Sequence, residues 1–372
     1  MINTCTVTGS ADRDALRLAR RISRRNPAAR LVVTGCLASR APEAVLKEAP
    51  GALLVGNEGK GSLPELLGCG EAASAGVRGL SGRSRALVKV QDGCDGACSY
   101  CVVPSVRPIL SSKPAAQAEA EVRGLLAGGY AEVVLCGVRL GRYAGDDSRG
   151  GTLHLSGLLE RLARLPGDFR VRLSSLDITE MTDELLEVVA GSAGKICPSF
   201  HLPLQSGSGS VLKRMRRPYT ADFYARRVEA LRKGLPSAGL FADVMAGFPG
   251  ETEAEHEESL RFVENLGFSG LHVFRYSKRA ATPAATLPGQ VPEGAKLERA
   301  RRMRALDLAL RAAFAARAVG GVRRALVEDG SPSGEALTED FLTVFLEPAP
   351  GPGLRRVRVI RSEGPAAYAV PI

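Results

Sequence analysis

The chain has 372 residues, of which 45% are hydrophobic, 24% are charged and 5% are aromatic. This length predicts two or three domains, and the balance of apolar and charged residues excludes a disordered chain. The 50 Lys and Arg residues outnumber the 40 Asp and Glu residues, which gives a net charge of +10. Such an excess favours polyanionic partners such as nucleic acid, although a solvated Arg-rich surface gives the same sum.

Neither a membrane-spanning segment nor a secretory signal is visible in the sequence. No apolar run approaches the roughly 18 residues that cross a bilayer. Residues 1–6 lack the basic and apolar regions of a signal peptide. We therefore expect a soluble, cytoplasmic protein with no membrane partner. The eight cysteines are too sparse for a disulfide framework, and the cytosol would keep them reduced.

Residues 1–68 alternate between strand and helix patterns. The predicted elements are a strand at 2–6, a helix at 12–25, a strand at 31–34, a helix at 42–48 and a strand at 52–55. This alternation indicates a small β/α domain with parallel strands. Residues 69–84 are rich in Gly, Ser and Ala, which predicts a linker.

Residues 85–317 continue the alternation through six β/α units. The predicted strands are 86–90, 132–135, 170–173, 199–202, 240–245 and 271–274, and the predicted helices are 115–126, 155–165, 183–189, 221–233, 253–266 and 295–319. Thr252 and Glu255 have the spacing of a capping box at a helix start. The pattern favours a partial parallel (β/α)6 barrel, with an open doubly wound sheet as the alternative.

Residues 318–372 have a different character. Strand-like stretches at 322–328, 341–346 and 354–360 are separated by turns rich in Gly, Pro and Ser. We expect a small antiparallel β-barrel, a fold often used to hold RNA.

Three of the eight cysteines lie within eight residues, directly after the first strand of the predicted barrel. Cys94, Cys98 and Cys101 form a C-x3-C-x2-C motif. Three thiolates on one tight loop can hold three irons of a [4Fe–4S] cluster and leave the fourth iron open to a substrate or cofactor. A structural zinc site is the alternative, but it requires a fourth ligand, and no His or further Cys lies nearby.

This motif, with Tyr100 before the third cysteine, resembles the radical S-adenosylmethionine (SAM) superfamily. In those enzymes the open iron binds SAM, and reduction of the cluster cleaves SAM to a 5′-deoxyadenosyl radical. More of the chain is similar to one family within the superfamily, the methylthiotransferases. The similar segments are residues 3–8, 33–36, 137–141, 172–175, 201–208 and 247–252, and residues 337–341, which resemble the RNA-binding TRAM domain of that family.

Within the family, residues 5–8 and 215–220 are most similar to the bacterial branch that modifies threonylcarbamoyladenosine in tRNA. The resemblance implies a radical SAM enzyme that places a methylthio group on carbon 2 of N6-threonylcarbamoyladenosine, next to the anticodon. Three alternatives stay open: an enzyme acting on isopentenyladenosine in tRNA, one acting on a ribosomal protein aspartate, and an RNA-binding protein that is inactive in sulfur transfer through N-terminal truncation.

The resemblance also implies roles for individual residues. Cys94, Cys98 and Cys101 would hold the radical-generating [4Fe–4S] cluster, and Cys5 and Cys36 would hold an auxiliary [4Fe–4S] cluster that carries the donated sulfur. The residues expected to bind SAM are Tyr100, Gly137, Ser174 and Gln205. An electron donor such as flavodoxin or ferredoxin would supply the reducing electron, and no catalytic side chain is singled out.

A basic run at residues 213–217 is a candidate site for tRNA phosphates. Its cations are Lys213, Arg214, Arg216 and Arg217. Such a run is more often a solvated helix face, and that alternative stays open.

The chain departs from the family pattern at three places. The first N-terminal cysteine of the family precedes the Asn-Thr-Cys motif and is missing, so we expect either a start upstream of Met1 or a failure of sulfur transfer. Residues 107–113 stand where the family usually has a Gly- and Arg-rich stretch. Arg275 and residues 280–281 stand where the family tends to have Pro and Gly.

The remaining thiols and imidazoles are expected to lie outside the clusters. The thiols are Cys69, Cys136 and Cys197. The imidazoles of His154, His256 and His272 are isolated in the sequence and are expected at the surface or in the core, whereas His201 is a candidate for a position near the SAM pocket.

Overall fold

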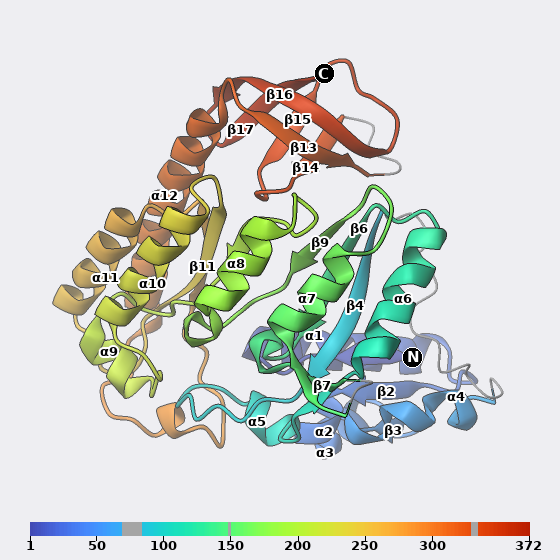
Figure 1. The fold of residues 1–372 in the computed structure, drawn as a ribbon. Helices are drawn as coiled ribbons and strands as arrows, with labels where there is room; N and C mark the ends of the chain where they lie inside the picture. Colours follow the sequence, from blue (N-terminus) through green and yellow to red (C-terminus); the bar gives the residue numbers. More distant parts are fainter. Residues whose placement is uncertain (69–83, 148–149, 329–333) are drawn as a thin grey trace. The chain divides into compact units, whose positions relative to one another are not determined.

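The computed structural model describes residues 1–68, 84–147, 150–328 and 334–372 (Figure 1). The chain divides into two compact units, and neither is one continuous segment. The first unit comprises residues 1–74, 93–110 and 277–288, and the second comprises residues 75–92, 111–276 and 289–372. Cys69 and the predicted linker at 69–84, apart from Ser84, lie outside the described residues. Within the described ranges, no helix has the length and apolar character needed to span a membrane.

The first unit is built on a three-stranded parallel sheet in the order β1–β2–β3. Its strands are β1 (Ile2–Thr4), β2 (Val32–Gly35) and β3 (Leu53–Val55), and its helices are α1 (Gly9–Arg25), α2 (Cys36–Arg40), α3 (Pro42–Glu48), α4 (Leu63–Leu66) and α5 (Val103–Val106). Val33 of β2, Ala19 of α1 and Val45 of α3 are among the buried residues that pack these helices onto the sheet. The predicted parallel β/α pattern is therefore present, with α2 as an additional short helix.

The second unit contains six parallel strands in chain order. The four-stranded sheet holds β4 (Arg85–Asp92), β6 (Glu132–Gly137) and β9 (Arg170–Leu173), with the antiparallel β5 (Ser111–Ser112) at its edge, and a three-stranded sheet holds β10 (Ser199–His201), β11 (Gly239–Ala246) and β12 (Gly270–Arg275). Backbone hydrogen bonds of 2.7 and 2.8 Å join Val171 to residues 195 and 197, and so connect the two sheets. The predicted partial (β/α)6 barrel is confirmed, and the open doubly wound alternative is wrong.

Helices cover the outer face of this barrel, as Figure 1 shows for α7 and α8. They are α6 (Ala115–Ala127), α7 (Leu155–Ala163), α8 (Asp183–Gly191), α9 (Gly209–Arg214), α10 (Ala221–Gly234), α11 (Glu253–Leu266) and α12 (Glu293–Ala318), and a short hairpin of β7 (Ala144–Asp146) and β8 (Thr152–His154) precedes α7. Thr252 and Glu255 form the predicted capping box at the start of α11. Leu240 and Val244 of β11 pack under the helices, so alternate residues of this strand face the barrel interior.

The C-terminal part of the second unit is a closed five-stranded barrel in the order β13–β14–β15–β17–β16. Its strands are β13 (Val322–Val327), β14 (Glu335–Thr338), β15 (Thr343–Leu346), β16 (Gly353–Glu363) and β17 (Ala366–Pro371). The predicted small barrel is confirmed, but it is not wholly antiparallel, since β15 pairs with β17 in parallel. The sequence did not indicate β14 and β17, because both contain Ala, a residue depleted in strands.

Two buried arginines of β9 connect the (β/α)6 barrel to the C-terminal barrel. Arg170 donates hydrogen bonds to the carbonyls of Arg324 (2.5 Å) and Leu337 (2.7 Å), and Arg172 donates to the carbonyl of Thr338 (2.9 Å). Both guanidinium groups also contact Glu132, at 2.5 and 2.9 Å. Burial opposes the charge on Glu132, but the two cations hold its pKa below the usual value. The two barrels therefore share a fully buried charged network.

Candidate functional site

The three-cysteine loop begins where β4 ends. Gly93 has φ +84°, and a Cβ at this position would lie 1.9 Å from the carbonyl oxygen of Ile109, so only glycine fits. The Cys94 amide donates to the carbonyl of Arg107 at 3.0 Å. The start of the loop is thus held in a sharp turn against residues 107–109.

Backbone amides of the loop face its sulfur atoms. The Gly96 N–H donates to Cys94 Sγ and the Val103 N–H donates to Cys101 Sγ, both at 3.4 Å. A Cβ on Gly96 would lie 3.3 Å from Cys94 Sγ and 4.0 Å from Cys98 Sγ, so this glycine leaves room between two of the thiols. Amide donors stabilise thiolate charge and are a feature of iron–sulfur sites. The three half-buried cysteines fit the ligand set of a [4Fe–4S] cluster.

Cys5 and Cys36 follow neighbouring strands of the N-terminal sheet. Thr4 and Gly35 are register partners at the carboxyl ends of β1 and β2, so the next residue of each strand is a cysteine. Gly35 has φ +98°, and a Cβ there would lie 2.4 Å from the Thr4 carbonyl oxygen. Since neighbouring strands lie about 4.8 Å apart, the backbones of the two cysteines lie close together at the carboxyl-terminal edge of this sheet.

Two further side chains contact Cys36 and were not indicated by the sequence. Arg107 Nε donates to Cys36 Sγ at 3.4 Å, and Asn57 Nδ2 donates to the same sulfur at 3.5 Å. Arg107 Nη2 also donates to Asn57 Oδ1 at 3.1 Å. Because the Arg107 carbonyl accepts the Cys94 amide, this residue links both sets of cysteines within the first unit. The contacts span 21 to 71 residues of sequence, which no local motif reports.

The residues expected to bind SAM are divided between the two units. Tyr100 is half-buried in the first unit, whereas Gly137, Ser174 and Gln205 belong to the second, at or after the carboxyl ends of its strands. A Cβ on Gly137 would lie 2.8 Å from Leu140 Cα, so glycine is required there as well.

Ser174 and Gln205 each present an unpaired polar atom. Ser174 Oγ and Gln205 Oε1 are buried without a hydrogen-bond partner, and Gln205 has the rare backbone angle φ +70°. Burying an unpaired polar atom costs about 1–3 kcal/mol, and strained residues cluster at ligand sites. These two atoms fit a site that pairs with the polar groups of a bound molecule such as SAM.

The basic run at 213–217 divides into exposed and internal cations. Lys213 and Arg216 are exposed. Arg214 forms an ion pair with Glu255 (2.8 Å), and Arg217 forms one with Asp177 (2.5 Å). Only Lys213, in α9, therefore fits the description of a solvated helix face, because Arg216 follows the end of this helix with φ +55°.

The histidines and the other two described thiols have distinct surroundings. His154 is exposed, and Cys136 and Cys197 lie in the second unit, where burial raises the pKa of both thiols. His256 is buried as expected of a core residue. His272 is not isolated, because its ring lies 4.9 Å from that of His201, centroid to centroid.

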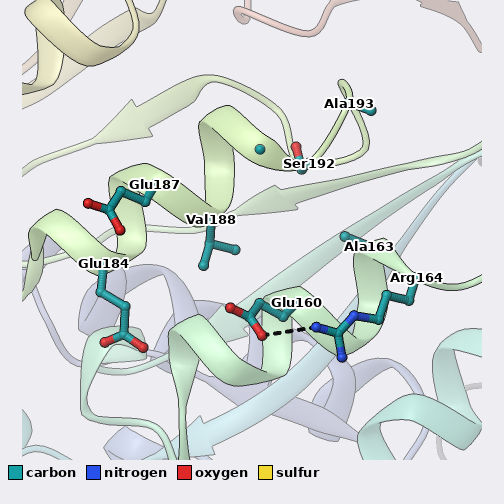
Figure 2. A pocket seen from close by; sticks show the side chains of 9 residues that line it. Glu160, Ala163, Arg164, Glu184, Glu187, Val188, Ser192 and Ala193 are labelled. Carbon is teal, nitrogen blue, oxygen red and sulfur yellow. Dashed lines mark hydrogen bonds and ion pairs between the residues drawn. The ribbon is translucent and has the colours of Figure 1, made fainter.

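A pocket of about 460 Å³ lies on the outer helices α7 and α8 (Figure 2). Its lining residues are Glu160, Ala163, Arg164, Glu184, Glu187, Val188, Gly191, Ser192 and Ala193. Arg164 reaches Glu160 at 3.4 Å across one helical turn, as Figure 2 shows. None of the residues expected to bind iron, SAM or RNA lines this pocket, so it is not the candidate site.

The chain matches two protein families, the Radical SAM superfamily over residues 88–263 and the Uncharacterized protein family UPF0004 over residues 1–56. The threonylcarbamoyladenosine tRNA methylthiotransferase MtaB of Bacillus subtilis (strain 168) is 37% identical over 325 residues, which are 82% of this chain and 71% of that protein. The chain belongs to the radical SAM methylthiotransferase family. The resemblance drawn from the cysteine motifs is thereby confirmed.

Other members of the family carry two different names. The MtaB of Chlamydia pneumoniae is 38% identical and covers 80% of this chain and 70% of its own length. The tRNA-2-methylthio-N(6)-dimethylallyladenosine synthase of Novosphingobium aromaticivorans (strain ATCC 700278 / DSM 12444 / CCUG 56034 / CIP 105152 / NBRC 16084 / F199) is 35% identical and covers 88% of this chain and 77% of its own length.

Among solved structures, the radical S-adenosylmethionine methyltransferase TsrM of Kitasatospora setae aligns with a TM-score of 0.58 at 16% identity. The match covers 77% of this chain and 64% of the TsrM chain. At this identity the likeness shows the fold, and it agrees with the partial (β/α)6 barrel of the second unit.

Proposed function

We propose that this chain is a tRNA-modifying radical SAM enzyme that places a methylthio group on carbon 2 of N6-threonylcarbamoyladenosine, next to the anticodon. Four relatives of 34–38% identity bear the name of that activity and support the substrate. The observation that carries the proposal is the gathering of Cys94, Cys98 and Cys101 with Cys5 and Cys36 in one compact unit, linked through Arg107.

The three cysteines of the loop would hold a [4Fe–4S] cluster. Bound together, the cluster and SAM supply the one-electron chemistry that an unactivated C–H bond requires. The amides of Gly96 and Val103 stabilise the thiolate charge of Cys94 and Cys101, and the close fit at Gly93 keeps the loop in its turn. A donor such as flavodoxin or ferredoxin would deliver the electron.

Cys5 and Cys36 would hold the auxiliary cluster that carries sulfur. Their adjacent places at the ends of β1 and β2 support a shared metal group, and Asn57 and Arg107 supply N–H donors to Cys36. The Arg107 cation also offsets the negative charge of the thiolate.

Gly137, Ser174 and Gln205 of the second unit would bind SAM, whereas the SAM role of Tyr100, in the first unit, stays a prediction. Gln205 Oε1 can accept a hydrogen bond from an amine, and Ser174 Oγ can donate to a carboxylate. Both atoms are buried and unpaired, which supports this role. Gly137 has no side chain to contribute, and it would instead allow SAM to approach the backbone closely.

Exposed cations of the second unit would contact tRNA phosphates. They are Lys213 and Arg216 of the basic run, and Arg356 and Arg358 on β16 of the C-terminal barrel. Arg214 and Arg217 would support the run from inside through their ion pairs. A tRNA substrate also implies that the reaction takes place in the cytoplasm.

Mass spectrometry of nucleosides tests the proposal. The reduced, anaerobically reconstituted protein is incubated with SAM and a tRNA that contains unmodified N6-threonylcarbamoyladenosine. We expect that nucleoside to gain a methylthio group in place of one hydrogen. Cys98→Ala should give no product and no SAM cleavage. An unchanged nucleoside with intact clusters and normal SAM cleavage would refute the assigned substrate.

Isopentenyladenosine in tRNA is the second candidate substrate. It is favoured by relatives of 32–36% identity that are named tRNA-2-methylthio-N(6)-dimethylallyladenosine synthase. A tRNA carrying isopentenyladenosine in the same assay decides between the two substrates, because each product has its own mass.

A further inference from the structure

Three polar side chains from three adjacent parallel strands converge inside the (β/α)6 barrel. His201 ends β10, Asp243 lies in β11 and His272 lies in β12. Asp243 and His272 are register partners, and His201 pairs with Phe241, two residues before Asp243. Residues two apart on a strand share one face, so the three side chains point to the same side of the sheet.

That side is the barrel interior. The neighbours Phe200, Leu240 and Leu271 belong to the core under the helices, which leaves the alternate positions on the opposite face. The exposed fractions of the His201, Asp243 and His272 side chains are 19%, 24% and 60%. The group is therefore partly enclosed and remains open to a small ion.

The donor atoms of these side chains lie close together. His201 Nε2 is 2.9 Å and His272 Nδ1 is 3.3 Å from the same oxygen, Asp243 Oδ1. All three donor atoms fall within 4.8 Å of one another. Tetrahedral ligands about 2.0–2.1 Å from a zinc ion are about 3.4 Å apart, so the observed separations suit one shared ion.

A fourth residue orients one of the imidazoles. Ser175 Oγ lies 2.5 Å from His201 Nδ1. When Nδ1–H donates to this hydroxyl, the lone pair of Nε2 points toward Asp243. Metal-binding histidines are typically held in this manner, by a hydrogen bond at the nitrogen that does not bind the metal.

We propose that His201, Asp243 and His272 form a binding site for a divalent transition-metal ion, with Zn²⁺ the best match. Two imidazoles and one carboxylate form a three-ligand set that leaves a fourth position for water or a small ligand. Fe²⁺ accepts the same set, whereas Mg²⁺ and Ca²⁺ prefer oxygen ligands. The ion would replace the protons that otherwise lie between the imidazoles and the carboxylate.

This site goes beyond the proposed function. It uses no cysteine and requires neither SAM nor tRNA. Its three ligands belong to the second unit, whereas the five candidate iron ligands belong to the first. The zinc content of the chain can therefore be measured independently of methylthio transfer.

The test measures zinc on the full chain with its iron–sulfur clusters reconstituted. The protein is incubated anaerobically with Zn²⁺ and desalted, and zinc and iron per chain are counted by mass spectrometry. We expect one zinc per wild-type chain, bound through nitrogen and oxygen by X-ray absorption, with no sulfur ligand at about 2.3 Å. Asp243→Asn and His272→Gln should weaken zinc binding at least tenfold, measured against a chromophoric chelator, with iron content unchanged.

Two variants distinguish loss of the metal site from loss of fold or from binding elsewhere. His272→Gln changes a largely exposed side chain, so loss of zinc there does not reflect loss of fold, which circular dichroism checks. His154→Gln removes an exposed imidazole outside the site and should leave zinc binding unchanged. Ser175→Ala should weaken binding about tenfold, as expected for a supporting hydrogen bond. Absence of zinc from the wild type, full binding by Asp243→Asn, or a sulfur ligand to zinc would each overturn the proposal.

Discussion

Ala281 adopts φ +69°, a left-handed conformation in which Cβ crowds the backbone. Residues 280–281 are among those that depart from the Pro and Gly pattern expected from the resemblance to the family. The left-handed conformation costs an alanine about 1–2 kcal/mol. Replacement by glycine removes this cost, but it also raises the conformational entropy of the unfolded chain, which offsets part of the gain in stability. We expect Ala281→Gly to raise the free energy of unfolding by about 0.5–1 kcal/mol in thermal or urea denaturation.

The neighbouring alanine supplies a matched control. Ala280 is also exposed but has no positive φ. Ala280→Gly should therefore leave stability unchanged or lower it by a few tenths of a kcal/mol. Equal effects from the two substitutions would contradict the argument from strain.

Arg107 supplies one of the N–H donors on Cys36, and it anchors Asn57, which supplies another. Arg107→Met should therefore weaken iron binding at the auxiliary site by about 10–100-fold, the usual effect of removing a partner of a metal ligand. The measurement is the rate at which a chelator removes iron, with Cys36→Ala as the reference for an absent auxiliary cluster. Arg123→Met, on the exposed face of α6, is the control. Iron loss at the wild-type rate would show that Arg107 does not support the cluster.

His256 makes stability depend on pH. Burial and the nearby Arg302 and Arg299 lower its pKa to about 4 in the folded chain, against about 6.5 when unfolded. The unfolded chain therefore binds the proton first, and stability is lost as pH falls from about 6.5 toward 4. Between pH 7.5 and 5.5 the wild type should lose about 1 kcal/mol more than His256→Gln, measured by denaturation at both pH values. Parallel pH profiles would rule out this assignment.

At the scale of elements, the sequence predicted those helices and strands that a local residue pattern determines. The strands predicted at 170–173 and 240–245 and the capping box at Thr252 match the observed elements closely. Helix α2 was missed because it has five residues and begins directly after a strand. Short elements of this kind are fixed by their contacts rather than by periodicity.

In the candidate site too, local motifs were predicted and contacts between distant residues were not. The spacing of Cys94, Cys98 and Cys101 is local and was readable in the sequence. The contact between His201, Asp243 and His272 depends on strand register across 29 to 42 residues, and the contact of Arg107 with Cys36 spans 71. A single sequence does not reveal pairings between distant residues, so His272 looked isolated.

At the scale of the whole molecule, the two compact units do not correspond to successive segments of the chain. The cysteine loop at 94–101 follows a strand of the second unit, yet it packs in the first with the N-terminal sheet. The boundaries predicted at 1–68, 85–317 and 318–372 describe successive segments, and they remain predictions. A loop shared in this way explains why cutting the chain at sequence boundaries would separate candidate iron ligands from their supporting contacts.

The C-terminal barrel shows most clearly that cutting the chain at a sequence boundary would remove supporting contacts. Arg170 and Arg172 are buried and donate to its backbone carbonyls. Deleting residues 320–372 would remove these acceptors, and a hydrogen bond to a charged group typically contributes about 1.5–3 kcal/mol. We therefore expect the shortened chain to melt at a lower temperature or to aggregate, even before tRNA is added. A shortened chain that melts like the full chain would contradict this role.

Surface substitutions test RNA binding without this loss of fold. Arg356 and Arg358 are exposed on β16, and their removal leaves the buried network intact. If each contacts one phosphate, the double variant Arg356→Gln/Arg358→Gln should bind tRNA more weakly and reduce the salt slope of log affinity by about 2. Its melting temperature and SAM cleavage should equal those of the wild type, and Arg123→Gln should match the wild type in all three measurements. An unchanged salt slope would mean that this face of the barrel does not contact tRNA.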